Sequence, residues 1–269
     1  MLHDWRTAAR EGWADIDETL RSSYRTSLLG WQEIATRYHR SRVGPFWLTI
    51  NKAVLIAVLS FVFGALFGLD TDYFIPFLAI GLIFWAFISA VLGDACLALS
   101  GSATTILHVR MPLFTHVAVM LCRNLLILAH NAIIIPLVLL LMFRPVGLDV
   151  LWFIPGLLLL CLNLGWMALI LAVICARFRD VTEIVGNALQ VLFYLTPIIW
   201  TTELLQGRIA IGWIYLNPLY HLLEVVRAPF LGDPISGVTW AAVIGMAVVG
   251  WAVALPFFGR FRHRVPYWL

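Results

Sequence analysis

The sequence has very little charge. Among its 269 residues are 18 basic and 15 acidic side chains, which is 12% of the chain, whereas 62% of the residues are hydrophobic. A soluble domain carries about 25% charged residues, and a soluble enzyme of this length could not cover its surface with half that share. The composition therefore excludes a soluble enzyme and a disordered chain, and it predicts a polytopic membrane protein.

Several motifs of catalysis are also missing. The chain has a single lysine, Lys52, which follows Asn51, so the Gly-Lys-Ser/Thr of a P-loop does not occur. The sequence contains no His-Glu-x-x-His zinc motif and no Gly-x-Ser-x-Gly nucleophile elbow. The four cysteines have neither metal-ligand spacing nor the pattern of a disulfide framework. We therefore expect no catalytic residue, no metal and no cofactor in this chain, and no P-loop ATPase activity of its own.

Long apolar runs separate the few charges. A helix that crosses a bilayer needs about 20 predominantly apolar residues, and the sequence has room for six such helices. We predict an all-α fold with a transmembrane domain over residues 43–259, whose spans lie at about 45–69, 73–97, 113–143, 150–175, 183–202 and 236–259.

The basic residues predict the orientation of these spans. Lys and Arg gather on the cytoplasmic side of membrane proteins. Most basic residues of this chain precede the first span, follow the second or fourth span, or follow Gly259. We therefore expect both termini in the cytoplasm, with cytoplasmic tails at residues 1–30 and 260–269.

Two segments do not fit a plain six-span bundle. Residues 31–42 predict a basic amphipathic helix, because Trp31, Ile34 and Tyr38 share one helical face and arginines surround it. Such a helix lies in the membrane interface and is either a surface anchor or a docking surface for a cytoplasmic partner. Residues 209–231 include a charge-free stretch, 209–223, which at 15 residues is too short to cross comfortably and is broken by Pro218. They predict a re-entrant gate on the outer side or a loop lying flat on the outer leaflet.

The aromatic and basic residues each leave two interpretations open. The chain has 12 Trp, 17 Phe and 7 Tyr, and those near span ends fit the interfacial belt. The deeper aromatic residues either pack in the core or against lipid, or form a stacking surface for a bulky substrate such as a sugar chain. Basic residues near the inner face either follow the positive-inside rule or attract a phosphate group.

Five segments together resemble a known family. The sequence over residues 28–264 is similar, in the same order, to the membrane subunits of ABC type-2 exporters, specifically those that export O-antigen and capsular polysaccharides. The segments that carry this resemblance are Arg37–Trp47, Leu107–Pro112, Ala176–Val181, Tyr194–Trp200 and Asn217–Gly232.

The resemblance implies a homodimer of six-span chains in the bacterial inner membrane, surrounded by membrane lipid. It implies two copies of a cytoplasmic ATP-binding subunit, which would hold the ATP and magnesium that this chain does not bind. The implied substrate is a polysaccharide on a polyprenyl pyrophosphate carrier, moved from cytoplasm to periplasm, and no nucleic acid is involved.

The resemblance and the residue pattern together suggest four sets of site residues. The expected contacts with the ATP-binding subunit are Trp31, Glu33, Arg37, Arg40, Thr104, His108 and Arg110. The residues expected to attract the pyrophosphate are Arg40, Arg42, Lys52, Arg177 and Arg179. The expected channel aromatics are Trp47, Phe84, Trp85, Phe193, Tyr194 and Trp200. The expected outer gate consists of Asn217, Pro218, Tyr220, His221, Glu224 and Arg227.

Competing interpretations remain. The nearest is the same type of permease with another cargo, such as capsule polymer, teichoic acid or a drug. A membrane glycosyl or lipid transferase would show clustered carboxylates or histidines on the loops of one face. A channel or secondary transporter would show intramembrane charge pairs or two broken helices in matching halves.

Overall fold

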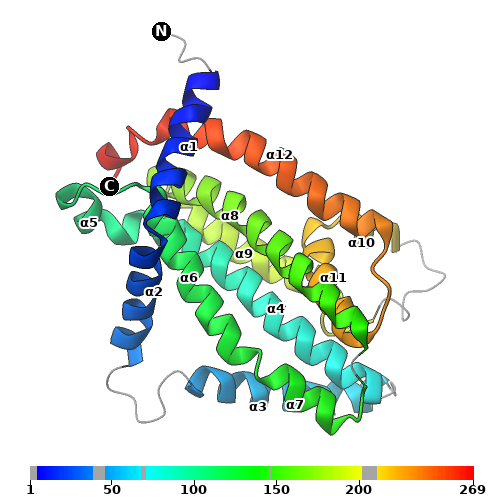
Figure 1. Ribbon diagram of the computed structural model, residues 1–269. Helices are drawn as coiled ribbons and strands as arrows, with labels where there is room; N and C mark the ends of the chain where they lie inside the picture. Colours follow the sequence, from blue (N-terminus) through cyan, green and yellow to red (C-terminus); the bar gives the residue numbers. More distant parts are fainter. Residues whose placement is uncertain (1–4, 39–45, 68–70, 146, 202–210) are drawn as a thin grey trace.

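The computed structural model describes residues 5–38, 46–67, 71–145, 147–201 and 211–269, and the described chain is helical throughout with short connections (Figure 1). Its α-helices are α1 (Trp5–Arg21), α2 (Ser23–Tyr38), α3 (Phe46–Phe67), α4 (Thr71–Ala98), α5 (Ala103–His108), α6 (Phe114–Asn131), α7 (Ile134–Leu141), α8 (Phe153–Arg177), α9 (Val181–Leu195), α10 (Ile211–Tyr215), α11 (Pro218–Leu231) and α12 (Gly237–Phe261). Short 3-10 helices are η1 (Ser100–Ser102), η2 (Leu148–Trp152) and η4 (Val265–Tyr267).

Four helical stretches are long and apolar enough to cross a membrane. They are Thr71–Ala98, Phe114–Leu141, Leu148–Arg177 and Gly237–Phe261, and shorter apolar helices cover Thr49–Gly64 and Val181–Leu195. The all-helical fold of the described residues confirms the predicted fold class, and the apolar helices agree with a polytopic membrane protein.

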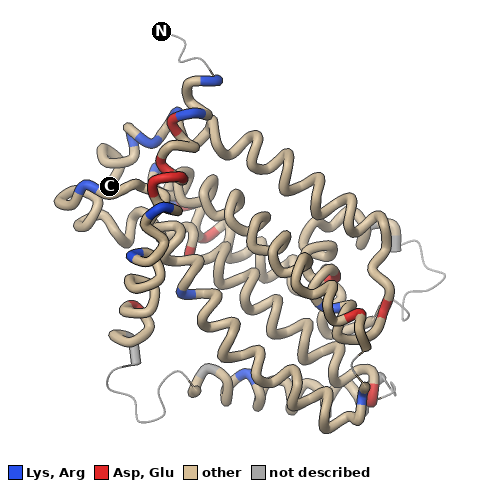
Figure 2. Tube along the Cα trace, in the orientation of Figure 1, with Lys and Arg blue, Asp and Glu red and all other residues tan. Residues whose placement is uncertain are grey.

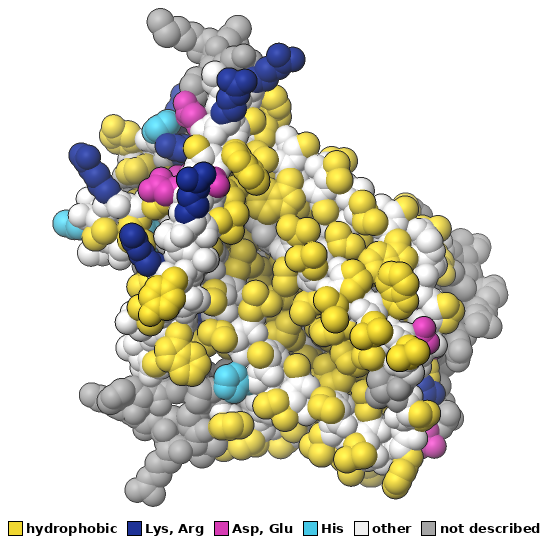
Figure 3. All heavy atoms as spheres, viewed as in Figure 1, with side chains coloured by type: hydrophobic (Ala, Val, Ile, Leu, Met, Phe, Trp, Pro, Cys, Tyr) yellow, Lys and Arg dark blue, Asp and Glu magenta, His cyan; other side chains and the backbone are white. Residues whose placement is uncertain are grey.

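Most of the described charges lie toward the two ends of these helices (Figure 2). We call the end that carries α1, α2, α5 and η4 the terminal end, and the end that carries residues 144, 145, 147–149 and 232–236 the opposite end. Most of the described basic residues gather at the terminal end (Figure 2). Hydrophobic side chains cover the visible face between the two ends (Figure 3). This distribution matches a chain whose middle contacts lipid.

Helix α4 lies at the centre of the bundle. It packs against α3, α6, α7, α8, α9 and α11, and apolar residues on all its sides are buried. A helix that is hydrophobic all round requires such surroundings. The other membrane-length helices therefore assemble around α4.

Prolines shorten or break two of the expected spans. The expected span 113–143 consists of α6 and α7, and Pro136 has no amide hydrogen to donate to Ala132. The expected span 183–202 ends as a helix at Leu195, because Thr196 precedes Pro197 and adopts an extended conformation. The ends of the expected first and fifth spans, at residues 68–69 and 202, lie outside the described residues.

The segment expected as an N-terminal tail is helical and well packed. Helix α1 runs along α12, and the two backbones approach closely where Gly12 faces Leu255 and Gly259 faces Ala8. A Cβ atom at either glycine would overlap a carbonyl oxygen of the other helix. The expected amphipathic helix 31–42 is the second half of α2, which already begins at Ser23.

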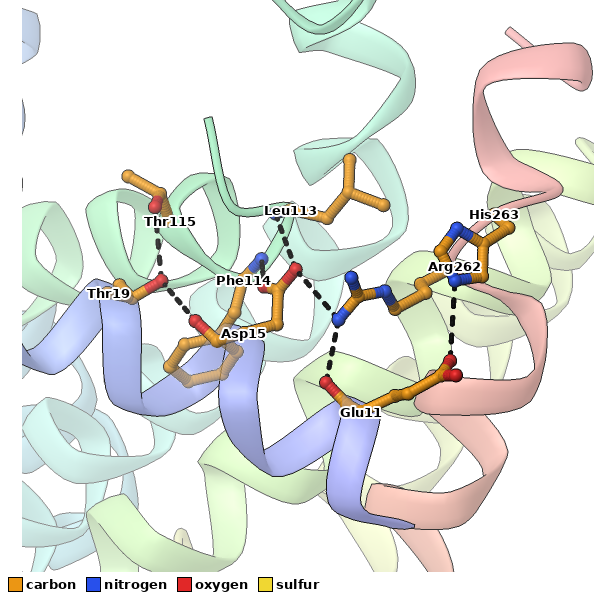
Figure 4. Close-up of polar contacts among 8 residues, drawn as sticks. All are labelled: Glu11, Asp15, Thr19, Leu113, Phe114, Thr115, Arg262 and His263. Atoms are coloured by element: carbon orange, nitrogen blue, oxygen red, sulfur yellow. Dashed lines mark hydrogen bonds and ion pairs between the residues drawn. The ribbon is translucent and has the colours of Figure 1, made fainter. Parts of the chain in front are cut away.

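Polar contacts fix α1 to both α6 and the end of α12 (Figure 4). The Asp15 carboxylate accepts hydrogen bonds from the amides of Phe114, at 2.9 Å, and Leu113, at 3.3 Å, and thereby caps the start of α6. Arg262 donates to the carbonyl oxygen of Glu11 at 2.7 Å. Burial raises the pKa of the Asp15 carboxyl, whereas these amides and the Arg262 charge lower it.

We predict that Gly259→Ala destabilises the contact between α1 and α12, because the new Cβ overlaps the Ala8 backbone. Overpacking of this kind costs about 1–3 kcal/mol, and thermal unfolding in detergent should show a lower Tm. Gly245→Ala on the same helix is the matched control, since its Cβ would meet nothing within 4 Å. Equal Tm values for the two variants would contradict this account of the α1 packing.

Candidate functional site

A polar groove of about 640 Å³ lies at the terminal end between α2, α5 and α6. It brings together described parts of the two segments expected to contact a partner, with Gln32, Glu33 and Thr36 from one and Ser102 and Thr105 from the other. Its walls are formed by Leu29, Gln32, Glu33, Thr36, Ser102, Thr105, Met111, Thr115, His116, Val119 and Arg123. The lining combines four hydroxyl groups, one side-chain amide and two charged side chains with the apolar Leu29, Met111 and Val119, a mixture that suits a protein contact.

A charge network forms one side of this groove. Arg123 of α6 donates to Glu33 of α2 at 2.5 Å and to Asp94 of α4 at 2.7 Å. Asn124 also donates to Asp94 at 2.9 Å. The Arg123 side chain is mostly buried, so removal of either carboxylate would weaken the compensation of its charge. Asp94 of the central helix α4 is therefore held by two side chains of α6.

The other expected partner contacts are spread over the groove's surroundings. Trp31 is exposed on α2, and Thr104 and His108 lie on α5, where the His108 ring contacts the Thr104 carbonyl oxygen at 2.8 Å. Arg110 is exposed just after α5. The Arg37 side chain is not among those described, and Arg40 lies outside the described residues.

The expected phosphate-attracting residues lie on separate elements. Lys52 is on α3, whereas Arg177 ends α8 and Arg179 precedes α9. The Arg177 guanidinium lies 5.5 Å from the ring centre of Phe178 and 6.0 Å from that of Trp268. Arg40 and Arg42 lie outside the described residues.

The expected channel aromatics separate into buried and exposed groups. Phe84 is completely buried and packs against Phe153, so it belongs to the core of the subunit. Trp85 is also buried, but its ring contacts Phe193 of α9, whose ring in turn contacts Tyr194. The exposed side chains of this set are Trp47 and Tyr194, and Trp200 is half-buried and donates to the Tyr194 carbonyl oxygen at 3.1 Å.

The six expected gate residues lie together at the start and middle of α11. Asn217 caps α11 by accepting from the Leu219 amide at 3.0 Å, Pro218 occupies the first turn, and the Asn217 amide donates to Thr196 at 2.9 Å. His221 is buried, with its two ring nitrogens 3.1 Å from Thr239 and 2.9 Å from the Tyr215 carbonyl oxygen. Residues 209–210 of the expected segment lie outside the described residues.

An almost fully buried arginine holds α11 in place. Arg227 is 2% exposed, donates to Glu224 at 2.6 Å and to the Pro197 carbonyl oxygen at 2.6 Å, and lies 3.9 Å from the ring centre of Phe77. The carbonyl of Pro197 is free because α9 has already ended. One arginine therefore connects α11, the stretch after α9, and α4. Tyr220, also buried, packs edge-to-face on Tyr215.

Several residues of these sites were not predicted. The groove's hydroxyl side chains were missed, although the run Ser100 to Thr105 is unusually polar for this chain and was a usable signal. Thr196 and Asp15 were missed because their partners, Asn217 and the start of α6, are distant in sequence.

Comparison with known proteins identifies the family. The sequence profile described as "ABC-2 type transporter" matches residues 24–231, which is most of the chain. The chain belongs to the ABC-2 type transporter family. It is therefore a membrane permease domain, a transport subunit without an ATPase domain, as predicted from the missing P-loop.

Relatives within the ABC-2 family carry a consistent description. An O-antigen export system permease protein RfbA of Myxococcus xanthus is 27% identical over 204 residues, which is 74% of this chain and 77% of the relative. Two proteins of the same description from Klebsiella pneumoniae are 20% identical over 239 residues and 21% identical over 240 residues, each covering 87% of this chain and 90% of the relative.

We predict that Arg227→Met lowers the free energy of unfolding by about 3–5 kcal/mol, because Glu224 and the Pro197 carbonyl lose their partner in a buried site. Thermal unfolding in detergent, followed by intrinsic fluorescence, measures the loss. Arg264→Met, which removes an exposed arginine, should change little. The double variant Arg227→Met/Glu224→Gln should recover part of the stability, and no recovery would contradict the pairing.

Proposed function

We propose that this chain is the membrane-spanning subunit of an ATP-driven exporter that moves a polyprenyl-pyrophosphate-linked polysaccharide of O-antigen type from cytoplasm to periplasm. The observation that carries the proposal is the polar groove of an ABC-2 permease, where α2 and the segment around α5 face each other at the end richest in basic residues. A separate ATP-binding subunit, holding ATP and magnesium, would dock in this groove.

The proposed topology has six crossings. They are α3, α4, α6 with α7, η2 with α8, α9, and α12, and the terminal end faces the cytoplasm. Helices α10 and α11 do not cross in this proposal. Asn217 is bonded to Thr196 just after α9, and Asp233 accepts from Tyr73 near the start of α4 at 2.8 Å. The start of α11 and the residues just after it are thus both held at the opposite end, which supports α11 as a re-entrant outer gate.

The proposed homodimer pairs α3 and α9 with their copies. Helix α9 has no buried residue within the subunit, and α3 exposes a row of large apolar side chains that includes Phe61, at 80%. In this proposal the second copy covers these two helices, whereas lipid covers other exposed apolar surfaces such as that of α12. Phe193, Tyr194 and Trp200 lie on or next to α9 and would line the channel together with Trp47, and the buried Trp85 of α4 would support the Phe193 ring from behind. Phe84 takes no part, because it is buried in the core.

The proposed mechanism begins at the groove. ATP binding would draw the two ATP-binding subunits together and displace α2 and the segment around α5. The displacement would separate α3 and α9 from their copies at the dimer interface. Arg177, Arg179 and Lys52 would attract the pyrophosphate from the inner leaflet, and the sugar chain would then pass along the aromatic side chains. Helix α11 would close the outer mouth.

The second candidate is a permease of the same type with capsule polymer, teichoic acid or a drug as cargo. The identities of 20–27% support the family rather than the cargo, and the relatives' descriptions favour O-antigen.

We predict that Thr105→Trp prevents docking of the ATP-binding subunit, because the indole fills the groove that Thr105 lines. Co-purification should fall at least tenfold, which corresponds to about 1.4 kcal/mol, and ATP-dependent export should stop. Val238→Trp introduces the same side chain at an exposed position at the other end of the molecule and should leave docking unchanged. Normal co-purification of Thr105→Trp would contradict the docking assignment.

A deletion strain distinguishes the cargoes. We expect loss of surface O-antigen and accumulation of lipid-linked polymer in the cytoplasm, because the carrier can no longer be moved across the membrane. Gel analysis of surface glycolipid and extraction of polyprenyl-linked sugars measure both effects, with the wild-type gene on a plasmid as the control. Intact surface O-antigen with lost capsule or raised drug sensitivity would favour the second candidate.

A further inference from the structure

A small cavity at the opposite end takes no part in the mechanism above. It measures about 350 Å³ and lies between η2, the end of α11 and the start of α12. Its walls include the indoles of Trp152 and Trp240, the carboxylates of Asp149 and Asp233, and the backbone at Gly232. Ligand pockets measure about 300–1,000 Å³, so this cavity suits one small ring rather than an extended chain.

The two tryptophans form an aromatic wall. Their ring centroids are 5.8 Å apart at an interplanar angle of 63°, an edge-to-face contact that fixes both rings. Trp152 is 58% exposed and Trp240 is half-buried. A tryptophan that only anchors a helix end at the membrane interface needs no carboxylate beside it. Here both rings border a cavity that also contains two carboxylates, and a pyranose ring presents an apolar C–H face to such a wall and hydroxyl groups around its edge.

The carboxylates supply acceptors for those hydroxyl groups. Ionised Asp accepts hydrogen bonds but cannot donate them, and the Tyr73 hydroxyl, donating at 2.8 Å, holds the Asp233 carboxylate in position. Burial raises the pKa of the Asp233 carboxyl, whereas the Tyr73 hydrogen bond and the nearby Arg144 and Arg227 charges lower it. Arg227 is already paired with Glu224, so Arg144 is the arginine that offsets part of the acidic charge of the cavity. A polyhydroxylated ring uses both features of the cavity, the aromatic wall for its C–H face and the carboxylates for its hydroxyl groups.

We propose that this cavity binds one saccharide unit of the exported polymer at the face where the polymer leaves. The proposal rests on the function proposed above. Pro229 and Gly232 line the cavity and also belong to α11 or to its C-terminal cap. A sugar in the cavity therefore touches the helix assigned as the outer gate, and it holds the emerging chain on the periplasmic side while α11 closes.

Binding is tested with the full chain in nanodiscs by saturation-transfer NMR. The probe is the polysaccharide released by mild acid hydrolysis from the surface glycolipid of the strain that encodes the protein, and ethanolamine is the competing cationic probe. We expect saturation of the sugar ring protons and little saturation of ethanolamine. Trp152→Ala should weaken sugar binding roughly fivefold to tenfold. Because Trp152 is exposed, the variant should keep its fold, which an unchanged Tm verifies. Trp5→Ala, an equally exposed tryptophan at the terminal end, should bind like the wild type.

The possible results distinguish a failure of the cavity proposal from a failure of the proposed function. If the deletion strain keeps all its surface polysaccharides, the proposed function fails. If the strain loses its polymer but the wild-type protein binds no sugar, or Trp152→Ala binds it as strongly as the wild type, the cavity proposal alone fails. Preferred binding of ethanolamine would also overturn the saccharide assignment, in favour of a lipid headgroup.

Discussion

The structure depends on the pairing of its few charges in an apolar chain. A charged group within an apolar bundle is costly unless an opposite charge or several hydrogen bonds compensate it. Arg123 satisfies this requirement with Glu33 and Asp94, and Arg227 satisfies it with Glu224 and the Pro197 carbonyl. Because Glu33, Asp94 and Pro197 lie on other elements than the arginine that each contacts, each buried arginine also fixes the relative positions of these elements.

The two arginines lie at two different sites, one beside the groove and one on α11. Arg123 connects α2, which borders the groove, to the central helix α4. Arg227 connects the gate helix α11 to the stretch after α9 and, through Phe77, to α4 as well. Helix α4 packs on most of the bundle, so both sites share one rigid element. A movement caused by a contact at the terminal end can therefore be transmitted through α4 to the opposite end.

The sequence predicted what depends on local pattern. The apolar runs predicted the all-helical fold, the basic residues before Val43 marked the helix that borders the groove, and Pro218 marked the break that begins α11. The sequence could not predict contacts between distant segments. Helix α1 was expected as a tail. Its burial depends on the close contact of α1 with α12 at Gly12 and Gly259, which are almost at opposite ends of the sequence. Phe84 was grouped with the channel aromatics because composition does not distinguish a core-facing ring from a channel-facing one.

The position of α1 adds a second connection from the groove. The family match covers residues 24–231 and so begins after α1 and ends before α12, yet these two helices pack closely together. Helix α1 continues into α2 after Ser22, whose amide still bonds to Glu18. On the proposed function, a partner that moves α2 therefore acts on α4 through Arg123 and on α12 through α1. Asp15 connects α1 directly to α6, because it caps the start of α6, the helix that carries Arg123. A displacement of α1 and α2 relative to α6 would break the Glu33 pair and the Asp15 cap together, and this joint cost favours movement of α1, α2 and α6 as one unit.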